Sequence, residues 1–479
     1  MFRLPTEIPL KFTSSKGPWR EVFSPNDGGL LTKVQLALDE DIHFLLKETK
    51  EVQKTISALK PYERSEILKD VAAQLQRDEE MLALLISSEG GKPLKDAKIE
   101  VKRAQITLEL CAEETLRLQG EVIPMERTSF GKDHFAFTIR EPIGAVLAIS
   151  AFNHPLNLIA HQVGCAIGSG CCVVLKPAPA TPLAANYLRE AFLRASLPEK
   201  GLRVVMADVP LIEKLVSSPE FDFVSFIGSQ KVGWELRKKL PPGTRLSLEL
   251  GGIAPAIVAQ DANLNAAAMA LTKGAFYHAG QACISTQRIY VHKNVFDQFL
   301  NCFKTLTEKL ITGNATHEPT DIGPLIRPEE VIRIQKWIQE ALDQGANLVT
   351  GNKVFGERHQ FLTPTILTHV SEVCTIMKEE VFGPVVCVNS YEDEEKLLNH
   401  LNNSDFIFES ALFSTDINRA FKIARDISTM TFVINNHTAF RVDQMPFGGH
   451  KKSGLGMGGV KYSMEEMTSL KQIILKIDQ

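Results

Sequence analysis

The segment Phe276-Tyr-His-Ala-Gly-Gln-Ala-Cys-Ile-Ser-Thr-Gln-Arg288 is the stretch around which the rest of the chain is organised. Cys283 lies in its middle, among small and polar neighbours, and the strand-like run Ile289-Tyr-Val291 follows. A cysteine in this setting is a nucleophile only if its surroundings lower the thiol pKa or remove the thiol proton. The alternative is a buried packing residue, which is the commoner role of a free cysteine.

Two further motifs favour the nucleophile over the packing residue. Leu248-Glu-Leu-Gly-Gly252 lies upstream of Cys283, and Glu380-Val-Phe-Gly-Pro384 lies downstream. In this order and spacing the motifs are highly specific, and they resemble the aldehyde dehydrogenase superfamily from about Tyr62 to the C-terminus. The resemblance implies an α/β fold with two doubly wound parallel-sheet domains and a β-hairpin oligomerisation arm. It also implies NAD(P)-dependent oxidation of an aldehyde.

Length and composition limit the class of protein. A chain of 479 residues is too long for one compact core, so at least two domains are expected. Hydrophobic residues make up 44% and charged residues 23%, which is ordinary for a soluble globular protein. The net charge of -4 gives no reason to expect nucleic acid or an anionic membrane as a partner. The N-terminus lacks the apolar core of a signal peptide, so we expect a cytoplasmic protein.

The eight cysteines fit reduced thiols better than a disulfide framework. None forms a C-x-x-C pair, and none combines with the 12 histidines at the spacing of zinc ligands. Most lie in apolar runs, as expected in a reducing compartment. We therefore expect no metal site.

Strand-like and helical patterns alternate downstream of Gly144. This alternation is typical of a parallel sheet covered on both faces, which binds ligands at the carboxyl ends of its strands. The expected strands are 145–150, 171–176, 203–206, 223–227 and 246–250, and the expected helices are 157–167, 182–195, 210–216 and 230–240.

Gly251-Gly252 is expected to be the hinge into a second alternating domain. The predicted boundaries are 1–121 and 143–251 for a cofactor-binding domain, 252–466 for a catalytic domain, and 122–142 and 467–479 for the arm.

The N-terminal third of the chain has three parts. The first thirty or so residues are rich in Pro, Gly and Ser and are expected to lie loosely on the surface, and residues 34–118 have a helical pattern. Residues 122–140 predict a long hairpin, and 470–477 predict a strand with no obvious mate. In the resembled family these two pieces form the oligomerisation arm, which implies a homodimer or homotetramer. The alternative is an internal sheet within one subunit.

The usual dinucleotide fingerprint G-x-G-x-x-G is absent after every predicted strand. Instead, Phe226-Ile-Gly-Ser-Gln-Lys-Val-Gly233 leads from a strand into a helix, with Gly228 at the turn and Ser229 as the expected cap. The alternative is a plain strand–helix turn. In the resembled family this segment contacts the pyrophosphate of the cofactor.

Lys176-Pro-Ala-Pro179 follows a buried strand, where a lysine is well placed for ribose hydroxyls or a phosphate. The alternative is a solvated lysine at the end of a strand. Members of the resembled family use this lysine on the adenosine ribose. Those that prefer NAD often carry an acidic residue where this chain has Pro179, so we rank NAD only modestly ahead of NADP.

The resemblance assigns further cofactor contacts around the hinge. Glu380 matches the glutamate that holds the nicotinamide-side ribose, and Phe382 matches the residue beside the nicotinamide. Leu250 is assigned to the same site. The alternative for Glu380 is an exposed acid after Glu379.

Three residues are assigned to the chemistry. In the resembled family the thiolate that matches Cys283 attacks the aldehyde carbonyl, and Asn153 matches the side-chain donor to the oxyanion. Glu249 matches the base that activates water to cleave the thioester. Because Glu249 lies at an apolar strand end, desolvation should raise the pKa of its carboxyl group toward neutrality. Its presence favours release of a free acid over transfer to coenzyme A. The alternatives are a turn residue for Asn153 and an ion-paired structural acid for Glu249.

The substrate is expected to be a short polar or anionic aldehyde. The helix after Asn153 places three polar residues on one face, Arg441 on a late loop is a candidate for anion binding, and Ala282 and Ile284 flank Cys283. The alternative is a polar helix face paired with its protein neighbours. The run His154-Pro-Leu-Asn157 loosely resembles lactaldehyde- and phosphonoacetaldehyde-type enzymes. The three polar residues on the helix face are His154, Asn157 and His161.

Two other functions are compatible with the same residues. A thiol esterase would use Cys283 and Glu249 without a cofactor. A catalytically silent protein would keep the dehydrogenase fold for binding or structure, and the intact set of site residues argues against it.

Overall fold

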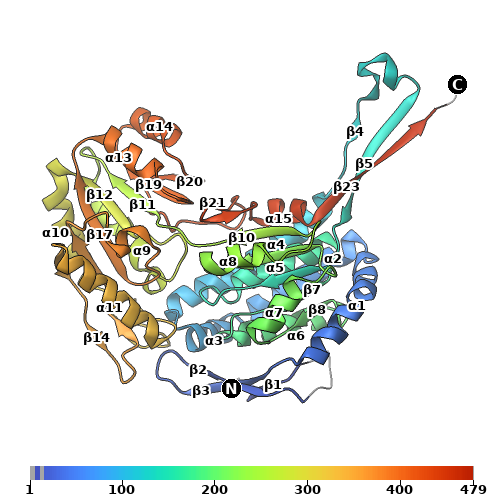
Figure 1. The fold of residues 1–479 in the computed structure, drawn as a ribbon, viewed down its shortest axis with the longest axis horizontal. Helices are drawn as coiled ribbons and strands as arrows, with labels where there is room; N and C mark the ends of the chain where they lie inside the picture. Colours follow the sequence, from blue (N-terminus) through green and yellow to red (C-terminus); the bar gives the residue numbers. More distant parts are fainter. Residues whose placement is uncertain (1–5, 11–15, 478–479) are drawn as a thin grey trace.

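The computed structural model describes residues 6–10 and 16–477. Figure 1 shows two α/β bodies beside each other, with a narrow arm projecting from the one that contains the first half of the chain. The α/β class with two largely parallel sheets is confirmed.

The first sheet has the strand order β22-β10-β9-β6-β7-β8. Five strands are parallel, and β22 pairs antiparallel with β10. The strands are β6 (Val146–Ile149), β7 (Val173–Lys176), β8 (Leu202–Val204), β9 (Phe223–Ile227), β10 (Arg245–Glu249) and β22 (Gly454–Leu455). The helices of this body are α1 (Asp39–Ser57), α2 (Pro61–Arg77), α3 (Glu79–Gly90), α4 (Leu94–Arg117), α5 (Asn157–Ser169), α6 (Pro182–Arg194), α7 (Val209–Val216), α8 (Gln230–Arg237) and α15 (Val460–Glu466).

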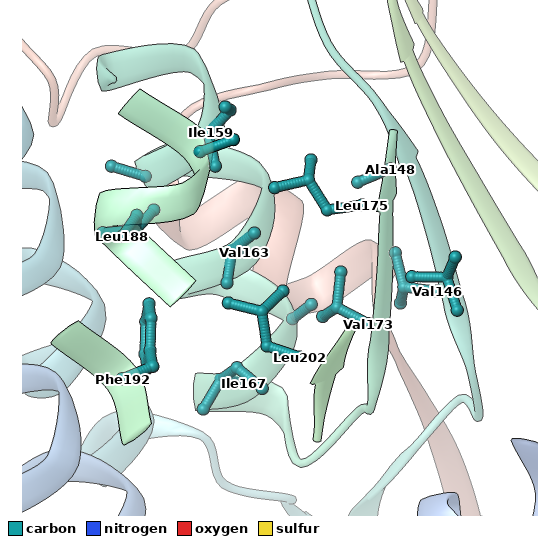
Figure 2. Close-up of a cluster of buried hydrophobic side chains, with 14 of the residues drawn as sticks. Val146, Ala148, Ile159, Val163, Ile167, Val173, Leu175, Leu188, Phe192 and Leu202 are labelled. Atoms are coloured by element: carbon teal, nitrogen blue, oxygen red, sulfur yellow. The ribbon is translucent and has the colours of Figure 1, made fainter. Parts of the chain in front are cut away.

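The central strands β6 and β7 form because they are short, apolar runs rich in β-branched residues and are buried on both faces. Figure 2 shows Val146, Val173 and Leu202 of the sheet packing toward α5 and α6. Complete burial of each such side chain contributes about 1.5–3 kcal/mol. This packing holds the carboxyl ends of the strands, and the loops that follow them, in fixed positions.

The N-terminal segment differs from the sequence prediction. Within its described part it forms a three-stranded sheet, rather than lying loosely, because alternating apolar residues form a small core with Met206. The backbone N–H of Ala37 also donates to the carbonyl of Met206, at 2.7 Å. These contacts fix the sheet to the loop after β8. Its strands are β1 (Glu7–Ile8), β2 (Trp19–Phe23) and β3 (Leu30–Gln35).

The second body is built on a seven-stranded sheet of order β13-β16-β17-β12-β11-β19-β20. Its strands are β11 (Pro255–Val258), β12 (Arg288–His292), β13 (Asn347–Thr350), β16 (Thr365–Thr368), β17 (Val385–Tyr391), β19 (Glu409–Phe413) and β20 (Thr431–Ile434), with the small pairs β14 (Val354–Phe355) and β15 (Phe361–Leu362), and β18 (Phe406–Ile407) and β21 (His450–Lys451). Its helices are α9 (Leu264–Phe276), α10 (Phe296–Thr307), α11 (Pro328–Asp343), α12 (Thr375–Lys378), α13 (Glu394–Asn402) and α14 (Ile417–Asp426), with the 3-10 turns η3 (Tyr277–Gly280) and η4 (Lys293–Val295).

The chain returns to the first body before it ends. Leu455 of β22 pairs with Leu248, and Val460 and Met464 of α15 belong to the first hydrophobic core. The boundaries predicted from the sequence place this segment in the second domain, whereas its packing is with the first. The discrepancy arises because β22 has only two residues, which are too few to show the alternating pattern that predicts a strand.

The arm is a three-stranded antiparallel sheet in which β5 lies between β4 and β23. The C-terminal strand therefore has its mate in the same chain, with Thr468 opposite Pro142 and Lys476 opposite His134. The elements of the arm are β4 (Val122–Ile123), η1 (Met125–Arg127), η2 (Ser129–Gly131), β5 (His134–Pro142) and β23 (Thr468–Lys476).

The described part of the chain contains neither a candidate membrane span nor a candidate metal cluster. No helix there is both long enough and apolar enough to cross a membrane. No group of three or more His, Cys, Asp or Glu side chains there is arranged to hold a metal ion.

Candidate active site

A cavity of about 840 Å³ runs past the carboxyl ends of the first sheet to the loop that carries Cys283. Every residue that the sequence analysis assigns to the site lines this cavity. They are Asn153, His154, Asn157, His161, Lys176, Pro179, Gly228, Ser229, Glu249, Leu250, Ala282, Cys283, Ile284, Glu380, Phe382 and Arg441.

Cys283 lies on the loop between η3 and β12, and two contacts fix this loop. The hydroxyl groups of Thr286 and Thr438 are 2.8 Å apart, and Thr438 Oγ1 donates to the carbonyl of Ile284 at 2.8 Å. Gly280 has φ +70°, and a Cβ there would lie 2.1 Å from the carbonyl oxygen of Gly383. Only glycine fits this approach, which brings the Cys283 loop against the loop that follows Glu380.

The thiol of Cys283 is not activated by its protein surroundings alone. Burial raises its pKa, the negative charges of Glu380 and Glu249 raise it further, and the positive charge of Arg441 opposes them. The thiol therefore needs a base or an added positive charge before it can attack.

Glu249 ends β10 and has the properties of a general base for a water molecule in the cavity. Burial raises the pKa of its carboxyl group, while the charge of Arg441 lowers it. A Cβ at Gly458 would lie 2.5 Å from Glu249 Oε1, so the absent side chain of this glycine leaves room for the carboxylate. Among the hydrogen bonds of the described residues, none uses the Glu249 carboxylate, which leaves it available for proton transfer.

Asn153 follows β6 and is 6% exposed. Its Nδ2 donates to the carbonyl of Gln281 at 2.9 Å, which joins the first body to the Cys283 loop. An amide has two N–H donors, so the second remains for an oxygen in the cavity.

Glu380 lies against the hinge. Burial raises its pKa to about 8, opposed by a hydrogen bond from the Gly252 N–H to Oε1 at 3.3 Å. Gln287 is a site residue that sequence reasoning missed, because its role depends on contacts outside its own motif. Its Nε2 donates to the Gly252 carbonyl at 2.9 Å, and its Oε1 accepts from the Val381 N–H at 2.7 Å. It therefore ties together the hinge, the Cys283 loop and the Glu380 loop.

The other end of the cavity suits a dinucleotide. Lys176 ends β7, and Gly228 and Ser229 lie at the N-terminus of α8, whose free N–H groups favour phosphate. Ser229 occupies the N-cap position, but its hydroxyl makes no capping hydrogen bond, so the predicted capping contact is wrong. With Glu380 at the hinge, the residues present fit the phosphates and both riboses of NAD(P).

The polar helix face is already paired within the protein. His161 Nε2 lies 2.9 Å from Asp443 Oδ1, and Asn157 Nδ2 donates to the same oxygen at 3.2 Å. His154 Nε2 lies 3.3 Å from the hydroxyl of Tyr277. The structure thus favours local pairing of these side chains over the substrate contacts that the sequence suggested.

Asp443 is the centre of this network, and no sequence motif indicated its role. Arg103 donates to its two carboxylate oxygens at 2.8 and 3.1 Å. Burial opposes ionisation, but hydrogen bonds from His161 and Arg103 hold the pKa of Asp443 well below its usual range. Burial lowers the pKa of His161 to about 4, so the imidazole is neutral at pH 7. The contacts of Asp443 with Arg103 and His161 fix the loop that carries Arg441.

Arg441 is a cation without a counter-ion of its own. Its guanidinium lies 3.5 Å from the centroid of the Phe447 ring, and its buried Nε has no hydrogen-bond partner. Burial lowers its pKa, and the charge of Glu249 opposes that shift. No ion pair joins it to any of the described acids, and Asp443 is occupied by Arg103 and His161.

Comparison with known proteins places this geometry in context. The family model of the aldehyde dehydrogenase family matches residues 12–473. The 3-sulfolactaldehyde dehydrogenase of Priestia aryabhattai is 40% identical over 447 residues, which cover 93% of this chain and 92% of that protein.

Two solved structures are similar along nearly the whole chain. Aldehyde dehydrogenase 21 from Physcomitrella patens, in complex with the reaction product succinate, has a TM-score of 0.95 and 33% identity, covering 98% of each chain. Glyceraldehyde-3-phosphate dehydrogenase GapN from Methanocaldococcus jannaschii, complexed with NADP, has a TM-score of 0.91 and 35% identity, covering 95% of this chain and 98% of that one.

Proposed function

The chain belongs to the aldehyde dehydrogenase family and oxidises an aldehyde with NAD(P), and from this premise we propose that its substrate is a short aldehyde that also carries an anionic group. The observation that carries the proposal is Arg441. Removing a guanidinium from bulk water is costly unless an anion pairs with it. The substrate would supply the anion that the protein does not.

The anionic group is a carboxylate, a sulfonate or a phosphate, because a guanidinium fork matches the oxygens of each. Two of the similar proteins support this chemistry. One is a dehydrogenase of a sulfonated aldehyde, and the other was crystallised with succinate, a dicarboxylate.

We propose that the thiol of Cys283 loses its proton to solvent and that the thiolate Sγ then attacks the aldehyde carbon, forming an S–C bond and placing negative charge on the former carbonyl oxygen. The free N–H of Asn153 and the backbone N–H of Cys283 donate to that oxygen. Bound NAD(P) supplies a hydride acceptor for the thiohemiacetal carbon, which becomes a thioester. Glu249 then takes a proton from the attacking water, the S–C bond breaks, and the carboxylic acid leaves.

We also propose a separate role for each of the two bodies and for the arm. The first body binds the cofactor, the second carries the nucleophile, and the arm joins copies of the chain into a homodimer or homotetramer. Exposed apolar side chains on the arm support the last point, since they need a covering partner. All eight cysteines are free, which is consistent with the cytoplasmic location expected from the sequence.

The test is formation of reduced nicotinamide from three- and four-carbon aldehydes that differ only in a terminal carboxylate, sulfonate, phosphate or hydroxyl group. For the anionic aldehydes, Arg441→Leu should lower kcat/KM by about 100-fold, the loss typical of removing one partner of a buried charge pair. The loss for the hydroxyl aldehyde should be much smaller, and Arg441→Lys should restore part of the activity. An equal loss for charged and uncharged aldehydes would refute the anionic substrate. Turnover that survived Cys283→Ala would refute the proposed nucleophile.

A further inference from the structure

The turn between β6 and α5 carries Asn153, and its backbone is held at its two ends. At the β6 end, the backbone N–H of Ser150 donates to the carbonyl of Lys176 at 3.0 Å. Among the described residues, no hydrogen bond uses a backbone N–H of residues 151–154. The side chain of Asn153 adds its bond to the Gln281 carbonyl. The backbone position of Asn153 therefore depends on what holds the start of α5.

The start of α5 has no capping side chain of its own, and Glu100 of α4 takes that role. The N-cap residue is Leu156, whose side chain cannot accept a hydrogen bond. Glu100 Oε1 instead accepts from the backbone N–H groups of Leu156 at 2.9 Å and Asn157 at 3.2 Å. One carboxylate oxygen thus satisfies two N–H groups that the helix itself leaves free, and it ties α5 to α4.

Lys92, in the segment between α3 and α4, completes this anchor. Its Nζ forms an ion pair with Glu100 Oε2, and both side chains are fully buried. Burial lowers the pKa of Lys92, and the charge of Glu100 opposes that shift. Nζ also lies 5.9 Å from the centroid of the Tyr277 ring, and the Tyr277 hydroxyl lies 3.3 Å from His154 Nε2. The pair therefore lies against η3 of the second body as well as the start of α5.

We propose that Glu100 is a positioning residue for stabilisation of the oxyanion: by holding the start of α5 it directs the free Asn153 N–H, and Lys92 holds the Glu100 carboxylate in place. Neither Glu100 nor Lys92 lines the cavity, so neither touches the substrate. The effect is large because a catalytic group misplaced by about 1 Å can cost about 10²-fold in rate. The proposal rests on the proposed role of Asn153 as a donor to the oxyanion, and it does not depend on the identity of the aldehyde.

Two double variants separate the contact with α5 from the buried charges. Lys92→Met with Glu100→Gln removes the ion pair but keeps an oxygen that can accept from the N–H groups of α5. Lys92→Met with Glu100→Leu removes the ion pair and that acceptor. The assay is formation of reduced nicotinamide from the three- or four-carbon aldehyde that the wild type oxidises fastest. The kcat/KM of the Glu100→Leu double variant should be about 10–100-fold lower than that of the Glu100→Gln double variant.

Asn153→Ala decides whether Glu100 acts through Asn153. Without that amide, the two double variants should differ by about 2-fold or less, because the group that Glu100 positions is gone. Glu89→Leu is the matched control, since the buried Glu89 carboxylate accepts from the N–H groups of Leu183 and Ala184 at the start of α6, at 2.8 and 3.0 Å. It should change kcat/KM by the same factor with and without Asn153.

The proposal is overturned if the two double variants have equal kcat/KM, or if their ratio is the same in the Asn153→Ala background, which would show a structural role only. Lys92→Met with Glu100→Met is a second variant without an oxygen acceptor, because a flexible methionine fits sites where leucine does not. It should behave like the Glu100→Leu double variant. An unchanged kcat/KM for Asn153→Ala alone would instead refute the proposed donor, so the two proposals fail in different measurements.

Discussion

At the scale of single residues, acidic and basic side chains surround the thiol of Cys283 and shift its pKa in opposite directions. Two acids, Glu249 and Glu380, raise the pKa of Cys283, and Arg441 opposes them. The same arginine lowers the pKa of Glu249, which burial raises. Arg441 therefore acts on the nucleophile and on the base as well as on the proposed substrate anion.

Glu249→Gln should separate the two halves of the reaction. The amide cannot accept a proton from water, so steady-state turnover should fall by about 10²–10⁴-fold, the usual contribution of a general base. The thioester can still form, so a rapid-mixing experiment should show a burst of reduced nicotinamide equal to the enzyme concentration. Glu330→Gln removes another cavity acid and is the control. Loss of the burst along with turnover would mean that Glu249 is needed before the thioester forms.

The pH dependence of kcat should report Glu249. Its pKa is raised above the ordinary 4.5, so its basic form is lost as pH falls while the pH is still above that value. The acid limb of the kcat profile should therefore lie above pH 4.5. Arg441→Leu removes the charge that lowers this pKa, and the limb should move to higher pH. A shift to lower pH would contradict the assignment of the limb to Glu249.

At the scale of elements, one loop is held by two helices of the other body. Asp443 lies between β20 and β21, and it binds Arg103 of α4 and His161 of α5. The loop thus reaches across the cavity and presents Arg441 to it. Its position depends on a carboxylate that does not touch the reacting atoms.

Asp443→Asn should loosen this loop without changing the chemistry. The neutral amide leaves Arg103 without its counter-charge, so KM for anionic aldehydes should rise about 10-fold while kcat changes less. The acid limb of the kcat profile, which depends on Glu249, should stay in place. Asp405→Asn, which breaks the exposed pair with Lys452, is the control. An equal fall in kcat with KM unchanged would show that Asp443 does not act through substrate binding.

At the scale of the whole molecule, the arm is the exposed feature that calls for a partner. Leu470 and Ile474 are 55% and 54% exposed on β23, and Val122 on β4 is 65% exposed. Residues two and four apart on a strand share a face, so the two β23 side chains lie on one side of the sheet. Gln472 lies between them on that face, and the arm projects from the first body (Figure 1).

A double variant, Leu470→Glu with Ile474→Glu, should shift the protein toward the monomer, because four or more like charges would meet in a symmetric interface. Light scattering coupled to size-exclusion chromatography gives the mass directly. Val373→Glu, at an apolar residue that is 62% exposed outside the arm, should leave the mass unchanged. A wild-type protein that is already a monomer would refute the assembly role of the arm.

Local pattern was enough to predict much of the fold. The strands at 145–150, 171–176 and 223–227 are apolar runs between turn residues, and each lies within two residues of the observed β6, β7 and β9. The motifs around Cys283, Glu249 and Glu380 predicted residues that do line one cavity.

The missed features all depend on partners distant in sequence. Arg103 and Asp443, for example, are 340 residues apart. No local periodicity encodes such pairs. The return of β22 to the first sheet was missed for the same reason, and so was the commitment of His161 to Asp443, because a polar helix face looks the same whether it faces a ligand or an acid.

The return of the C-terminus has a consequence for how the chain is made. Arg140 of β5 and Thr468 of β23 are 328 residues apart, so β5 leaves the ribosome long before its mate exists. At about 5–20 residues per second, the interval is roughly 15 to 65 seconds. During that time an apolar strand edge is open on a nascent chain whose first domain also lacks β22 and α15. The sheet of the arm and the first domain are therefore complete only after the second domain has been synthesised.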